Sequence, residues 1–133
     1  MSFATAFCVE VVGFQRAPTP CDLDQSPDRP DICLGTDPAH TPSWLLNAAR
    51  SRFAGAGLSV ALDRPYAGVL VPEKHAGMAS TVFALMVEIN RRLYLNEATG
   101  TKRVEFTEVA TMVEGVLRDL RSAVDAHRRT TIA

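Results

Sequence analysis

Glu88 is the residue whose type and surroundings most suggest chemistry. It interrupts an apolar run at residues 82–89, and an unpaired ionised carboxylate buried in such a run costs on the order of several kcal/mol. An ion pair with Arg91 or Arg92, or an edge position facing water, is one interpretation. The other is a carboxylate that projects from a strand end into a cleft, with a raised pKa that lets it act as a general base. The sequence leaves both interpretations open.

Other reactive groups lack the spacing that self-contained sites need. None of His40, His75 and His127 has a His, Cys, Asp or Glu three or four positions downstream, so none begins the helical ligand pair of many zinc hydrolases. We expect each of them to be an ordinary surface or loop residue, and we predict no metal site in this chain. The chain also has neither a GxSxG nucleophile elbow nor a glycine-rich phosphate loop.

The elements that must position Glu88 follow from hydrophobic periodicity. A run of β-branched and aromatic residues predicts a strand at residues 82–89, and similar segments predict strands at residues 6–14, 32–34, 58–62 and 68–71. A Pro/Asp-rich loop spans residues 17–38 around the second of these strands.

Two helices are expected between and after these strands. Thr41 and Pro42 have the pattern of a helix start, and Gly55 and Gly57 that of its end. A second helix begins near Thr107 and carries apolar residues at i, i+3 and i+4. This order of elements predicts an α/β domain with a mixed sheet.

Composition limits the classes of function. With 133 residues, 47% of them hydrophobic, the chain is expected to be a single domain covering residues 1–133. A formal net charge of −1 leaves no basic surface for nucleic acid. No apolar run approaches the ~20 residues that span a bilayer, and the first charged residue is Glu10 rather than a basic leader residue. We therefore expect no membrane partner and a cytoplasmic protein.

Three phrases carry a family resemblance. They are Arg-Pro-Asp-Ile-Cys-Leu-Gly-Thr-Asp at residues 29–37, Pro-Tyr-Ala-Gly at residues 65–68 followed by Val-Pro, and Val-Glu-Ile-Asn-Arg-Arg-Leu-Tyr at residues 87–94. In order and spacing they resemble the C-terminal half of N-formylglutamate amidohydrolases, over roughly residues 8–120. The resemblance implies a three-layer α/β domain with a mixed sheet, similar to the zinc carboxypeptidase and aspartoacylase group.

The same resemblance implies an activity and a set of site residues. Members of the family are zinc hydrolases that cleave the amide C–N bond of N-formyl-L-glutamate to give formate and glutamate, using a metal-activated water and a carboxylate that carries its proton. Glu88 occupies the position of that carboxylate, which makes it the expected catalytic general base. Asn90 and Arg91 are the expected substrate-binding residues, since an arginine fork binds a small carboxylate-bearing ligand through two hydrogen bonds.

The chain departs from the family at the metal. Two zinc ligands of the family lie in an N-terminal half that has no counterpart here, and the third belongs to an Asp-x-His-Ser-Phe-Pro phrase whose histidine is replaced by Val12. Although the family uses zinc, we therefore predict no metal ligands and no cofactor in this chain, because an aliphatic side chain has no lone pair to donate.

This departure leads to a second hypothesis about the function of the protein. The protein would then be a truncated, non-catalytic homologue that acts as a ligand-binding or protein-interaction module. In that case Asp37, His40, Tyr66, Lys74 and Arg91 would line a remnant pocket. Loss of the N-terminal half would expose part of the sheet, so we expect a homo-oligomer or a partner chain to cover it.

Overall fold

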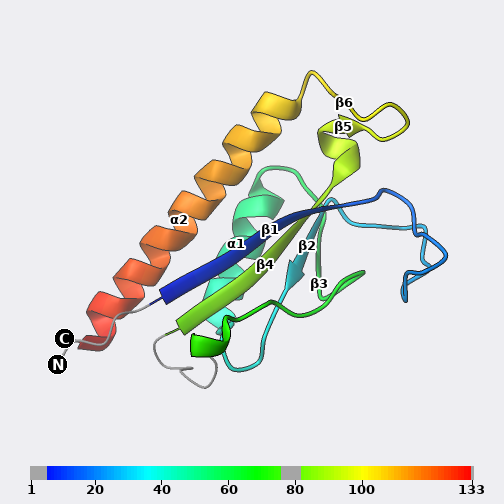
Figure 1. Ribbon diagram of the computed structural model, residues 1–133. Helices are drawn as coiled ribbons and strands as arrows, with labels where there is room; N and C mark the ends of the chain where they lie inside the picture. The colour runs from blue at the N-terminus through cyan, green and yellow to red at the C-terminus, as the bar shows by residue number, and fades with distance from the viewer. Residues whose placement is uncertain (1–5, 76–81, 133) are drawn as a thin grey trace.

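A mixed four-stranded sheet forms the centre of the molecule. The computed structural model describes residues 6–75 and 82–132 (Figure 1). The strands are β1 (Ala6–Phe14), β2 (Ile32–Gly35), β3 (Val60–Leu62) and β4 (Val82–Asn90), in the order β1-β4-β2-β3. β4 runs parallel to β1 and antiparallel to β2, while β2 and β3 are parallel. All nine residues of β4 are buried, as the continuous apolar run predicts for a strand covered on both faces.

Two helices cover one face of this sheet. α1 (Ser43–Gly55) and α2 (Phe106–Ile132) contact each other, and α2 runs along the sheet on the β1 side (Figure 1). Because side chains alternate along a strand, the odd-numbered positions of β4 join the helices in one apolar core. Its fully buried members are Ile32, Leu34, Leu45, Ala49, Phe53, Leu85, Val87, Leu120 and Val124.

Irregular chain covers part of the second face of the sheet, where Val12 of β1 remains 42% exposed. The Cys33 thiol on this face donates a hydrogen bond to the carbonyl of Tyr66 at 3.1 Å, and the carbonyl of Gly68 lies against Gly35. The described residues thus make two layers, a sheet and its helices, where three layers were expected. No helix among the described residues is long and apolar enough to cross a membrane.

Short elements follow β4. The 3-10 helix η2 (Arg91–Leu93) begins directly after it, and β5 (Leu95–Asn96) and β6 (Thr101–Lys102) form a small antiparallel hairpin before α2. Another 3-10 turn, η1 (Glu73–His75), precedes β4. Elements of two or three residues leave too little periodicity to be predicted from sequence.

Two expected local structures differ from those observed. Residues 68–71 are not a strand, because Gly68 has a φ of 86° and the N–H of Leu70 bonds the carboxylate of Glu10 rather than a neighbouring strand. The expected helix cap at Thr41 is also wrong. The Thr41 hydroxyl donates to the carbonyl of Ala84 at 2.6 Å, and Pro42 occupies the N-cap position without a side-chain hydrogen bond.

Candidate functional site

Glu88 lies near the carboxyl end of β4, flanked by two neighbouring strands. Its register partners are Val12 of β1 and Cys33 of β2. The residue is 8% exposed, and its Oε2 atom has no hydrogen-bond partner among the described residues. The ion pair that one interpretation expected is not present within this part of the chain, since Arg92 pairs instead with Asp31 at 2.6 Å. The edge position is also wrong, because β4 is a central strand.

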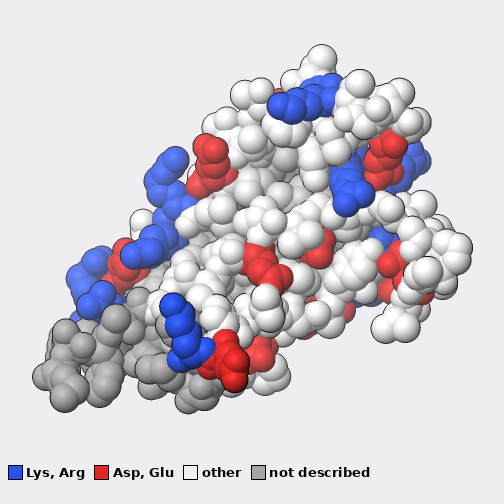
Figure 2. Space-filling model, in the orientation of Figure 1, with Lys and Arg blue, Asp and Glu red and all other residues white. Residues whose placement is uncertain are grey.

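The electrostatic surroundings of Glu88 favour its protonated form. Burial is the largest cause that raises the pKa of its carboxyl, the negative charge of Glu10 raises it further, and Arg91 lowers it only in part. Acidic atoms lie near the centre of the face where β1 and β4 run, while basic atoms lie mostly toward the rim (Figure 2). Such a carboxyl keeps its proton to a higher pH than an ordinary glutamate, which suits a group that accepts and returns a proton.

Arg91 is placed at the end of β4 by the start of η2. Its Cγ and Nε both lie 3.5 Å from the point where a Cβ on Gly13 would stand, and the hydroxyl of Tyr94 also lies over Gly13. Burial raises the pKa of Tyr94, and the adjacent Arg91 opposes that rise by charge and by a hydrogen bond. Arg91 and Tyr94 therefore form a pair at the carboxyl ends of β1 and β4, close enough to Glu88 for the charges to interact.

Asn90 is held entirely within the fold. It is 0% exposed, its Nδ2 donates to the carbonyl of Pro30 at 3.1 Å, and its Oδ1 accepts from the N–H of Arg92 at 3.1 Å. The second of these bonds caps η2. Both ends of the amide thus fix the turn that carries Arg91, while contact with a substrate remains a prediction.

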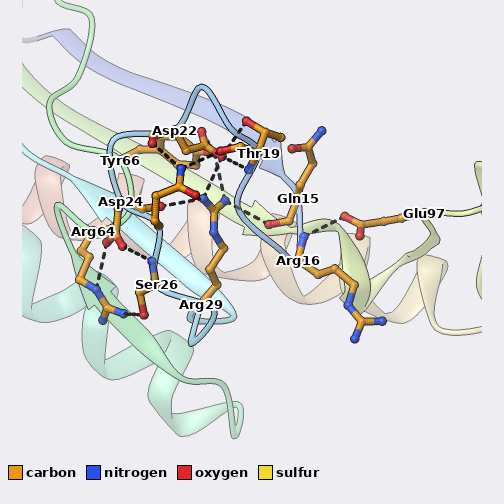
Figure 3. Close-up of polar contacts among 11 residues, drawn as sticks. Gln15, Arg16, Thr19, Asp22, Asp24, Ser26, Arg29, Arg64, Tyr66 and Glu97 are labelled. Atoms are coloured by element: carbon orange, nitrogen blue, oxygen red, sulfur yellow. Dashed lines mark hydrogen bonds and ion pairs between the residues drawn. The ribbon is translucent and has the colours of Figure 1, made fainter.

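Arg29 organises a polar cluster that sequence reasoning missed (Figure 3). Its side chain is 1% exposed and pairs with Asp22 at 3.0 Å. It also donates to the hydroxyl of Tyr66 and to the carbonyl of Gln15, and its guanidinium lies over the rings of Phe14 and Tyr66. These contacts tie the Pro/Asp-rich loop to the end of β1. The sequence signal for this cluster was an arginine among prolines and aspartates. Its partners could not be identified from that signal, because they lie up to 37 positions away in the sequence.

The residues of the expected remnant pocket take part in separate local contacts. Asp37 and His40 share the turn before α1, Tyr66 belongs to the Arg29 cluster, and Lys74 is exposed in η1. Among the described residues, no hydrogen bond or ion pair joins any of these to Arg91.

The histidines differ in part from expectation. His40 lies in a turn, but it is 4% exposed rather than at the surface, and its Nδ1 lies 3.1 Å from the carbonyl of Val82. The ring of His127 stacks on Trp44, with centroids 4.4 Å apart. The side chain of His75 lies outside the described residues.

Zinc needs three or four nitrogen, sulfur or oxygen ligands from the protein. No group of three His, Cys, Asp or Glu side chains that could hold a metal ion is found in residues 6–75 and 82–132. Val12, which the family resemblance places at a ligand position, lies directly beside Glu88 in the sheet. The described residues therefore do not fit zinc by themselves.

Comparison with known proteins identifies the family. The family model described as N-formylglutamate amidohydrolase matches residues 3–95, and no match is found among curated proteins. The crystal structure of N-formylglutamate amidohydrolase from Ralstonia eutropha JMP134 is similar in fold, with a TM-score of 0.72 and 22% sequence identity. The similarity covers 93% of this chain but 45% of that one, so this chain spans less than half the length of its structural relative. The chain belongs to the N-formylglutamate amidohydrolase family.

Proposed function

We propose that this protein is an amidohydrolase-like domain that binds an N-acyl amino acid of the N-formyl-L-glutamate type and hydrolyses its amide bond. The observation that carries the proposal is the buried Glu88 carboxyl, whose Oε2 has no partner among the described residues and whose pKa is raised. A structural glutamate is expected to be paired when buried. A glutamate that works as a general base must keep an oxygen available for water or substrate.

In this proposal Glu88 transfers the proton and Arg91 binds the ligand. The Glu88 carboxylate accepts a proton from water as the water oxygen bonds to the formyl carbon, and it returns that proton to the nitrogen as the C–N bond breaks. The guanidinium of Arg91 pairs with a carboxylate of the ligand beyond the ends of β1 and β4. Asn90 supports this arrangement by capping η2, the turn on which Arg91 lies.

A second candidate function is favoured by Val12. An aliphatic side chain beside Glu88, together with the lack of a three-ligand group in the described part of the chain, leaves Glu88 without the activated water on which the family relies. The domain would then bind a carboxylate-bearing ligand, or a second polypeptide, without turning over a substrate.

Formate release from N-formyl-L-glutamate separates the two functions. The assay compares the wild-type protein with Glu88→Gln, each with and without added zinc, and uses Glu114→Gln on the exposed face of α2 as the matched control. Hydrolysis is supported by turnover that Glu88→Gln abolishes and Glu114→Gln leaves intact. Calorimetric binding of N-formyl-L-glutamate without turnover in either condition supports ligand binding as the second function. A protein that neither binds nor hydrolyses the compound would contradict both hydrolysis and ligand binding, and would leave binding of a second polypeptide as the function to test.

A further inference from the structure

Gly13 in β1 allows the side chains of Tyr94 and Arg91 to lie unusually close to the backbone of the strand. A Cβ built on this glycine would overlap the Tyr94 hydroxyl and would lie 3.5 Å from two side-chain atoms of Arg91. The glycine lies inside a regular strand, where it lacks a side chain that would stabilise the sheet. A glycine within a strand commonly marks the close approach of another group, and here that group is Tyr94 together with Arg91.

Tyr94 is positioned to control where the Arg91 guanidinium lies. The N–H of Tyr94 donates to the carbonyl of Arg91 at 3.1 Å and closes the η2 turn. Its ring packs edge to face on Phe106 at the start of α2, with centroids 5.8 Å apart. Backbone and ring are therefore both fixed, and the hydroxyl is held at the side of Arg91.

We infer that Tyr94 is a positioning residue whose hydroxyl holds Arg91 over Gly13, in the orientation that receives the carboxylate of a ligand. The inference rests on the proposed function and extends it. Recognition of the carboxylate would depend on Gly13 at the end of β1 and on Tyr94 after β4, as well as on Arg91 itself. An arginine with several rotatable bonds loses less entropy on binding when a neighbour has already fixed its fork.

The first test measures the contact without any ligand. The chain has two tyrosines, so the difference in tyrosinate absorbance between the wild-type protein and Tyr94→Phe follows Tyr94 during an alkaline titration. Because Arg91 lowers the pKa of Tyr94 against the effects of burial, Glu88 and Glu97, Arg91→Gln should move the titration of Tyr94 to higher pH. The exposed Arg118→Gln is the control, and an equal midpoint in both variants would overturn the inference.

The second test measures binding of glutarate, which has two carboxylates and no amide, by calorimetry. Arg91→Gln should weaken the affinity by about tenfold or more, and Tyr94→Phe by roughly three- to tenfold, as expected for lost charged and neutral hydrogen bonds. Gly13→Ala should act like Tyr94→Phe, because the added methyl group displaces the hydroxyl. Gly115→Ala, where a Cβ meets nothing within 4 Å, should have no effect on affinity.

The outcomes separate this inference from the proposed function. If the wild-type protein does not bind glutarate, or if Arg91→Gln binds it as tightly as wild type, carboxylate recognition by Arg91 is wrong and the inference falls with it. If Arg91→Gln weakens binding while Tyr94→Phe and Gly13→Ala do not, the proposed function stands and the positioning role of Tyr94 is wrong. Thermal melting of each variant shows whether the fold is retained.

Discussion

Replacing Glu88 with glutamine should stabilise the protein at neutral pH. The substitution keeps the shape of the side chain but removes a charge from a residue that is 8% exposed and has an unpartnered buried oxygen. Leaving a buried polar group unsatisfied costs roughly 1–3 kcal/mol, and a charged carboxylate costs more than the neutral amide that replaces it. A gain of about 1–2 kcal/mol is therefore expected, and each kcal/mol raises the Tm of a domain of this size by roughly 3–6 °C.

The size of this effect should depend on pH. The pKa of Glu88 is raised in the folded protein above its ordinary value of 4.5, so the folded state binds the proton more tightly than the unfolded chain does. The wild-type protein thus loses stability relative to Glu88→Gln as pH rises from about 4.5 through the folded pKa. Below that window both side chains are neutral and their stabilities should converge.

Urea unfolding at several pH values checks the reasoning, with Glu114→Gln on the exposed face of α2 as control. We expect the difference in unfolding free energy between wild type and Glu88→Gln to grow with pH, and that of the control to stay near zero. A glutamine variant less stable than wild type at neutral pH, or a gain that persists unchanged at acidic pH, would refute the account of Glu88 as a destabilising buried carboxylate. A gain in stability accompanied by loss of formate release would mark the residue as one retained for function.

Three further substitutions test the structure around the site. Arg29→Ala should lower the free energy of unfolding in urea, because it removes a fully buried side chain that pairs with Asp22 and lies over the rings of Phe14 and Tyr66; an unchanged free energy of unfolding would contradict this. Gly35→Ala should lower the Tm markedly, since a Cβ there overlaps the backbone carbonyl of Gly68, which cannot rotate away; an unchanged Tm would show that the loop yields. Phe53→Ala should destabilise by about 3–5 kcal/mol through the cavity it leaves in the core, and recovery of stability on filling the core with a small apolar ligand would support that cause.

The strands and helices with long patterns could be predicted from sequence. β4 follows from an uninterrupted apolar run, and α2 from its helical period over many turns. The position of Glu88 within β4 was equally clear, because a single charge in such a run is conspicuous. These features depend on neighbours in sequence, and local composition therefore contains the needed information.

The contacts that define the site could not be predicted in the same way. The glycine that admits Tyr94 and the loop arginine that pairs with Asp22 each act on residues brought near by the fold. Nor does composition reveal that Cys33 and Val12 become the neighbours of Glu88, since strand register is decided by the packing of whole faces.

The place of β4 in the sheet also governs the order in which the chain can fold. β1 is synthesised before the other described strands, yet its only strand partner among the described residues is β4, and β2 also pairs with β4. Until residue 82 leaves the ribosome, the residues of β1 form an apolar segment without a strand partner. The later pairing of β1 with β4 must also close the long loop between them. Folding is therefore expected to be slow for a chain of this length, and the nascent protein to depend on protection from aggregation until β4 arrives.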